Sequence, residues 1–122
     1  MLRKKPLTLC DTGHNLNGLR EVVRQLRLIP HEQLHFVLGM VVDKDLDQIL
    51  EILPRQAIYY FCKPDIHRGL DAETLAAKAM EAGINGSIHE SVQAALQSAT
   101  EKADAADLIF VGGSTFVVAE VV

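Results

Sequence analysis

The chain has 122 residues, of which 48% are apolar and 23% charged, a balance typical of one globular domain with its own core. Twelve basic and sixteen acidic residues give a net charge of −4, and we expect Arg3-Lys4-Lys5, at the N-terminus, to be the only basic cluster. Nucleic-acid binders usually carry a broader basic patch, so we expect no nucleic-acid partner.

Apolar runs alternate with apolar residues at helical spacing. The runs predict strands at residues 7–10, 35–42, 57–61, 86–88 and 108–111. The spacings predict helices over residues 19–26, 46–53, 75–80 and 92–99. Residues at the expected helix ends are Pro30, Pro54, Asp71, Gly83 and Ser91. We predict a last helix after residue 114, although the four valines there are β-branched and favour a strand.

Strands that alternate with helices predict an α/β fold class. We expect a Rossmann-like, mainly parallel five- to six-stranded sheet with helices on both faces, because the strands are continuous apolar runs. Ligands of such sheets bind outside the carboxyl ends of the strands. By this rule, five segments are candidates for ligand binding: residues 11–17, 39–45, 62–71, 89–91 and 112–115.

The two cysteines and the lack of a long apolar span bear on the compartment. Cys10 and Cys62 each end an apolar run without a CxxC spacing, which predicts two buried, reduced thiols. No signal-peptide pattern or membrane-length apolar stretch occurs in the sequence. We therefore expect a soluble, cytoplasmic protein without a membrane partner.

The segment after the first strand concentrates polar groups at an expected helix start. Asp11 could accept hydrogen bonds from ribose hydroxyls or an ammonium group, and His14 could donate to a phosphate or carboxylate. Gly13 would let a ligand approach the backbone closely. The competing interpretation for any one residue is local: Asn15 or Asn17 could simply cap the helix. The cluster as a whole favours a ligand site.

Four segments resemble one known family. Asp-Thr-Gly-His-Asn at residues 11–15 resembles the Asp-x-Ala-His-Asn-Pro signature that opens the C-terminal domain of folylpolyglutamate and dihydrofolate synthases, members of the Mur ligase superfamily. Residues 37–45 resemble that family's strand ending in glycine, followed by Asp-Lys-Asp. Residues 63–70 resemble its loop with Pro and Arg-Ala-Leu, and residues 112–120 its closing Gly-Ser-x-(aromatic)-x-Val-(small)-Glu run. This chain departs from the family pattern at three places. Leu16 replaces the usual proline, Thr12-Gly13 replaces the usual Gly-Ala or similar pair, and Gly69 stands where alanine is common.

The resemblance implies an activity and roles for individual residues. The family uses ATP to activate a folate or dihydropteroate carboxyl as an acyl phosphate, which the amino group of L-glutamate then attacks. The resemblance implies that Asp11 contacts ATP and that His14 and Ser114, the expected catalytic residues, lie at the glutamate and phosphate side. By their own chemistry, Gly13, Asn15 and Lys44 are further candidates for the nucleotide, and Arg68 is a candidate for binding a carboxylate of the substrate. Two local alternatives stay open: Lys44 could be a solvated lysine, and Arg68 could pair with Asp65 or Asp71.

The chain contains no GxxxxGK[ST] phosphate loop. The resemblance places that loop, the Mg ligands and the folate pocket in an N-terminal ATPase domain that is absent from this chain. We therefore expect residues 1–122 to form a single C-terminal, glutamate-ligase domain, monomeric and able to fold alone, but inactive alone.

Other functions fit less well. Another Mur-type amino-acid ligase is disfavoured because Gly112-Gly113-Ser114-Thr115 lacks the Gly-Gly-Asp-Arg type of closing loop. A phospho-receiver domain would need an aspartate after the third strand and a lysine after the fifth, and neither is present. A non-catalytic Rossmann-like binding module remains open. The five histidines and two cysteines have no zinc-ligand spacing, so we expect no metal held by this chain.

Overall fold

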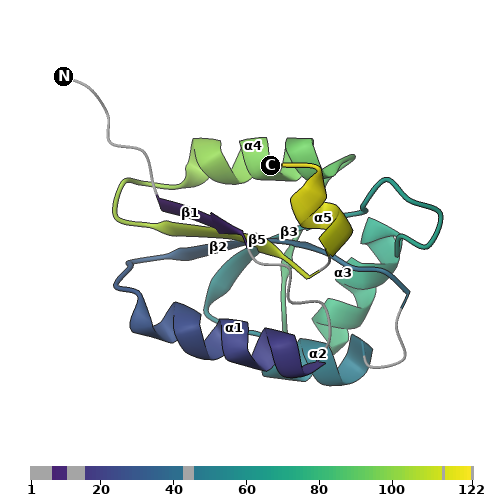
Figure 1. The fold of residues 1–122 in the computed structure, drawn as a ribbon, viewed down its shortest axis with the longest axis horizontal. Helices are drawn as coiled ribbons and strands as arrows, with labels where there is room; N and C mark the ends of the chain where they lie inside the picture. Colours follow the sequence, from purple (N-terminus) through teal and green to yellow (C-terminus); the bar gives the residue numbers. More distant parts are fainter. Residues whose placement is uncertain (1–6, 11–15, 43–45, 114, 122) are drawn as a thin grey trace.

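The computed structural model describes residues 7–10, 16–42, 46–113 and 115–121, along which strands and helices alternate (Figure 1). The strands are β1 (Leu7–Cys10), β2 (Leu34–Gly39), β3 (Ala57–Cys62), β4 (Gly86–Ile88) and β5 (Leu108–Gly112). The helices are α1 (Leu16–Leu28), α2 (Leu46–Ile52), α3 (Ala72–Glu81), α4 (Val92–Lys102) and α5 (Thr115–Ala119). This alternation confirms the predicted α/β fold class.

The strands form one sheet in the order β1-β5-β2-β3-β4, and every neighbouring pair is parallel. The last strand in the sequence, β5, therefore lies between β1 and β2. Because parallel strands end at the same edge, the segments that follow β1, β5 and β2 start side by side. The topology thus places the carboxyl ends of β1 and β5 side by side, with Cys10 opposite Val111, although about a hundred residues separate them in the sequence.

Helices cover both faces of the sheet, as Figure 1 shows, with α1, α2 and α3 on one side and α4 and α5 on the other. Successive residues of β2 point to opposite faces: Phe36 and Leu38 pack in the core beneath α1, α2 and α3, and Val37 packs beneath α4. All six residues of β2 are buried. Burial on both faces explains why the strands lack the polar alternation of a half-exposed sheet.

Several predicted helix ends are confirmed. The Ser91 hydroxyl accepts the Ala94 N–H at 3.0 Å, which caps α4. Gly83 has a φ of +84°, its N–H donates to the Met80 carbonyl, and the Ile84 N–H donates to the Ala79 carbonyl at 2.8 Å. These two bonds form the Schellman motif that ends α3.

Two sequence predictions need correction. The second strand ends at Gly39 rather than Val42, because the backbone beyond Gly39 turns away to pair with a later loop. Cys10 is exposed rather than buried, since β1 is an edge strand, whereas Cys62 is buried as predicted. The predicted last helix is confirmed as α5, a short helix in which the β-branched Val117 and Val118 are buried.

Candidate functional site at the carboxyl edge of the sheet

Two glycines bring the carboxyl ends of β2 and β5 into backbone contact. Gly113 has a φ of +98°, and a Cβ placed on it would lie 2.5 Å from the Gly39 carbonyl oxygen. A Cβ on Gly39 would lie 2.6 Å from Val117 of α5. Both positions therefore require glycine, because a side chain would force the strand ends and α5 apart. Position 114 follows directly from this close contact.

The loop of residues 63–71 packs against the backbone that follows β2. The Val42 N–H donates to the Arg68 carbonyl at 3.0 Å, and the Leu70 N–H donates to the Met40 carbonyl at 2.8 Å. Gly69 allows the loop to turn tightly, since a Cβ there would lie 2.5 Å from the Pro64 carbonyl oxygen. These contacts place Arg68 beside Val42, one residue before the segment 43–45 that contains Lys44.

The end of α5 holds the same loop from the other side. The Glu120 carboxylate accepts the Asp65 N–H at 2.8 Å, and its main-chain carbonyl accepts a hydrogen bond from the Gln93 side chain at 2.9 Å. Burial, followed by the nearby negative charge of Glu120, raises the pKa of the Cys62 thiol to about 12. Cys62 is therefore a neutral core thiol. These contacts of Glu120 span 55 and 27 residues, so local sequence patterns do not reveal its role.

The alternative salt bridges of Arg68 are not formed in the described part of the chain. Lys63, not Arg68, pairs with Asp71, with 3.5 Å between Nζ and Oδ1. Asp65 is held through its backbone by Glu120. The Arg68 side chain is exposed, so its guanidinium can reach a ligand at this edge.

Arg68 is the one predicted site residue whose position the structure describes. The other predicted residues, Asp11, Gly13, His14, Asn15, Lys44 and Ser114, lie outside the described residues. The described residues that flank them converge: Cys10 and Val111 are register partners on β1 and β5, and Leu38 and Gly112 on β2 and β5. The predicted site segments therefore leave the sheet from three adjacent strands.

A cleft of about 480 Å³ lies farther along the same edge, between the starts of α3 and α4. Lys63, Thr74, His89 and Glu90 are among its lining residues. His89 bonds to the Ser87 hydroxyl at 2.7 Å, and burial together with the charge of Lys102 lowers the pKa of His89. Among the described residues, no three His, Cys, Asp or Glu side chains gather in a way that could hold a metal ion.

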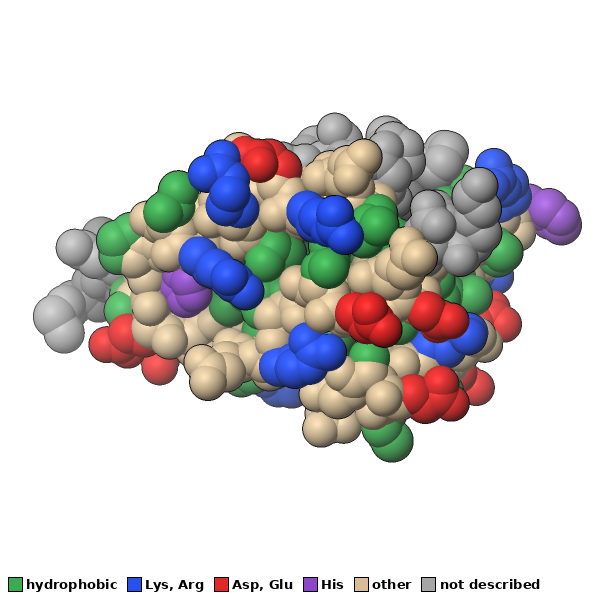
Figure 2. Space-filling view, turned by 90° about the horizontal axis from the view of Figure 1, so that it is seen from below, with side chains coloured by type: hydrophobic (Ala, Val, Ile, Leu, Met, Phe, Trp, Pro, Cys, Tyr) green, Lys and Arg blue, Asp and Glu red, His purple; other side chains and the backbone are tan. Residues whose placement is uncertain are grey.

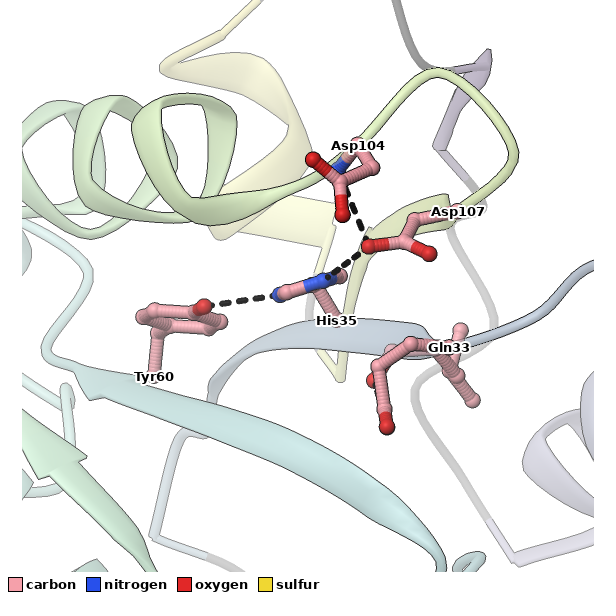
Figure 3. A network of polar contacts seen from close by, with 6 residues as sticks. Gln33, His35, Tyr60, Asp104 and Asp107 are labelled. Carbon is pink, nitrogen blue, oxygen red and sulfur yellow. Dashed lines mark hydrogen bonds and ion pairs between the residues drawn. The ribbon is translucent and has the colours of Figure 1, made fainter.

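A buried polar network occupies the opposite edge of the sheet (Figure 3). His35 Nδ1 shares a hydrogen bond of 2.7 Å with the Tyr60 hydroxyl, and His35 Nε2 lies 2.9 Å from the Asp107 carboxylate. The same carboxylate accepts the Asp104 N–H at 3.0 Å. His35 is near the start of β2 and Asp107 directly precedes β5, so the network lies at the amino ends of the strands. It ties β2, β3 and β5 together, away from the candidate site.

The sequence also matches a known family across nearly its whole length. Residues 1–115 match the family model described as Mur ligase, glutamate ligase domain. The chain belongs to this family. A relative from Haloferax volcanii, described as a probable bifunctional folylpolyglutamate synthase/dihydropteroate synthase, is 36% identical over 119 residues, which are 95% of this chain and 14% of that protein.

Several solved structures share the fold. E. coli FolC in complex with ADP superimposes with a TM-score of 0.87 and 28% identity, over 98% of this chain and 29% of that chain. The bifunctional folylpolyglutamate synthase/dihydrofolate synthase with Mn, AMPPNP and L-glutamate bound gives a TM-score of 0.83 and 27% identity, over 98% of this chain and 29% of that chain. The chain thus spans less than a third of each of these relatives. Along the residues that the structure describes, no helix has the length and apolar character of a membrane span.

Proposed function

We propose that this Mur ligase domain is the glutamate- and nucleotide-facing half of an ATP-dependent ligase that adds L-glutamate to a folate or to dihydropteroate through an acyl phosphate. One observation carries the proposal. Three of the four segments that resemble folate ligases are joined at one sheet edge by the contacts of Gly113 with Gly39 and of Val41 with Gly69. The fourth segment, residues 11–15, follows β1 at the same edge.

Each proposed residue has a role that suits its chemistry. Asp11 is proposed to contact the ATP ribose, with Gly13, Asn15 and Lys44 on the nucleotide side. His14 and Ser114 are proposed to orient the glutamate amine and the acyl phosphate, because imidazole and hydroxyl groups can hold a reacting group in place without forming a covalent bond. Arg68 is proposed to bind a glutamate carboxylate through its planar guanidinium.

The rest of the machinery is proposed to lie in an ATPase domain that closes over this edge. That domain would supply the phosphate loop, the folate pocket and the ligands of Mg²⁺, whose role is to neutralise the ATP phosphates. Support comes from FolC relatives that are described with ADP, or with AMPPNP and Mn. We further propose a monomer in the cytoplasm, a compartment in which free thiols such as those of Cys10 and Cys62 stay reduced.

A domain graft tests the activity. Residues 1–122 replace the matched part of E. coli FolC, and ADP release is measured with dihydropteroate, with and without L-glutamate. We expect glutamate-dependent turnover by the graft and none by the 122-residue chain alone. His14→Ala or Ser114→Ala should lower kcat/KM by about a hundredfold, as loss of a group that holds the transition state does. Arg68→Gln should raise the KM for glutamate by about tenfold with a smaller change in kcat.

The matched control is Lys102→Gln, which removes a cation from α4 on the far side of the sheet. The proposal fails if a folded graft releases no ADP in response to glutamate. It also fails if Lys102→Gln and Arg68→Gln change the KM for glutamate equally.

A further inference from the structure

Two adjoining hollows, of about 510 Å³ and 290 Å³, share Arg27, Pro54 and Arg55 and form one groove between α1 and the end of α2. We call it the α1–α2 groove. Its floor is apolar, with Val23 and Leu26 of α1 among the lining residues. Its walls carry four arginines, Arg20, Arg24, Arg27 and Arg55, and one acidic residue, Glu51.

Helical spacing creates this arginine cluster. Arg20, Arg24 and Arg27 stand at positions i, i+4 and i+7 of α1, so they share one exposed stripe of the helix. Arg55 comes from the connection between α2 and β3 and faces the same groove. Figure 2 shows basic side chains gathered over one part of this face and acidic side chains over another. The expectation of no basic patch beyond the N-terminus is therefore wrong for the folded chain.

Internal partners use only part of this positive charge. Arg24 forms an ion pair with Glu21, and Arg55 donates to the main-chain carbonyls of Glu51, at 3.0 Å, and Leu53. In the described part of the chain, Arg20 and Arg27 form no ion pair with an acidic side chain. The groove therefore holds unused guanidinium groups in a chain whose net charge is −4.

The groove leads away from the candidate site. α1 begins at Leu16, directly after residues 11–15, and ends at Leu28, before β2 starts at the other edge. Arg20 and Arg24 are separated by about 6 Å along the helix axis, at 1.5 Å per residue. A γ-linked glutamate adds five backbone bonds per residue, which extend to about 6 Å. The spacing of consecutive α-carboxylates in an extended chain therefore matches that of Arg20 and Arg24. Arg24 and Arg27 are about 4.5 Å apart along the axis, a distance that a bent chain spans.

We propose that the α1–α2 groove binds a chain of γ-linked glutamates, the chemistry of a folylpolyglutamate tail. This inference rests on the proposed function, which supplies the reason for such a ligand. Each α-carboxylate would accept hydrogen bonds from one guanidinium, and the methylene groups would cover the apolar floor. The groove would retain long tails near the edge where glutamate is added.

Other polyanions fit the groove less well. Single-stranded nucleic acid is usually held by aromatic stacking, and none of the residues that line the two hollows is Phe, Tyr or Trp. Glu51 lies on the border between the groove and a neighbouring hollow that Asp47 and Glu81 also line, so a long uniform polyanion would meet three carboxylates. A short carboxylate chain along the arginines of α1 would meet only Glu51.

The test is direct binding of γ-linked tetraglutamate to this chain. A fluorescently labelled tetraglutamate is titrated at low ionic strength and followed by anisotropy, and the matched probe is γ-linked tetraisoglutamine, in which each α-carboxylate is an uncharged amide. We expect tetraglutamate to bind and tetraisoglutamine not to bind. The double variant Arg20→Gln/Arg27→Gln should weaken binding by about fivefold, as loss of two exposed ion pairs predicts. Lys102→Gln is the control, because it also replaces a cationic side chain with glutamine but lies on the other side of the sheet. It should leave binding unchanged.

Three results would overturn the inference: no tetraglutamate binding, equal weakening by Lys102→Gln, or tighter binding of oligouridylate than of tetraglutamate. Concentration-dependent dimerisation that the double variant abolishes, without tetraglutamate binding, would assign the groove to a second copy instead. The domain graft separates this inference from the proposed function. If the graft is active but the chain binds no tetraglutamate, only the proposed groove ligand is refuted. If the graft is inactive but the chain binds tetraglutamate, only the proposed ligase activity is refuted.

Discussion

Gly113→Ala should destabilise the domain far more than Gly83→Ala, although both glycines have a positive φ. An L-residue at such a φ costs about 1 to 2 kcal/mol, and both variants share that cost. At Gly83 the nearest atom to an added Cβ is Arg55 Nε at 3.6 Å, an ordinary contact. At Gly113 the added Cβ would lie 2.5 Å from the Gly39 carbonyl oxygen, a backbone atom that cannot rotate away. Such overpacking costs about 1 to 3 kcal/mol more.

Urea unfolding followed by far-UV circular dichroism measures the difference. We expect Gly83→Ala to lower the free energy of unfolding by about 1 kcal/mol and Gly113→Ala by about 3 kcal/mol. Equal losses in the two variants would refute the reasoning, because they would mean that β2 and β5 are not in backbone contact at their carboxyl ends.

Three further predictions concern stability and thiol reactivity. Burial alone would raise the pKa of Asp107, but hydrogen bonds from its neighbours outweigh this effect and lower the pKa below 3.8. The ionised carboxylate therefore stabilises the fold above that pH, and this stabilisation is lost as the pH falls through the folded-state pKa. Asp107→Asn should therefore lower the free energy of unfolding at neutral pH by about 1 to 3 kcal/mol and flatten its acid dependence, whereas the exposed Glu32→Gln should change little. Ser91→Ala should cost about 1 kcal/mol in urea unfolding through loss of the α4 cap. Cys10 should react with a chromogenic disulfide reagent in the native state, and Cys62, buried and with a pKa of about 12, only after unfolding.

Each of these predictions has a clear contrary result. An acid dependence of Asp107→Asn equal to that of the parent chain would remove the carboxylate from the stabilising network. A Ser91→Ala variant as stable as the parent would show that the 3.0 Å bond to Ala94 contributes nothing. Native reaction of both thiols at similar rates would contradict the buried position of Cys62.

Local sequence patterns were sufficient for the elements of the fold. Helical spacing located Leu19, Val22 and Leu26 on the buried side of α1, and the cap residue Ser91 located the start of α4. These features depend on residues within one or two turns of each other, which is the range over which propensity and capping act. The continuous apolar runs also predicted a sheet covered on both faces.

Long-range features could not be predicted from the sequence. The position of β5 between β1 and β2 depends on the whole packing, and so does the network that joins His35 to Tyr60 and Asp107 over 25 and 72 residues. The exposure of Cys10 follows from the edge position of β1, which the apolar run alone does not reveal. The role of Glu120 in holding the loop of Arg68 has the same long-range origin.

Most of the arginine cluster could have been predicted from the sequence. The spacing of Arg20, Arg24 and Arg27 is a helical stripe, but it is invisible to a search for consecutive basic residues. The contribution of Arg55 from a separate loop required the fold.

The central claim is that the carboxyl edge of β1, β5 and β2 forms a half-site for ATP and glutamate, and amide chemical shifts test it most directly. The isotope-labelled chain is titrated with ATP, then with L-glutamate, and two-dimensional spectra are compared. We predict shifts in residues 16–18, 40–42, 69 and 112–113, which border the proposed ligand residues, and unchanged amides around His35 and Asp107 at the opposite edge. Unchanged amides at the carboxyl edge, or shifts confined to the α1–α2 groove or the opposite edge, would contradict the claim.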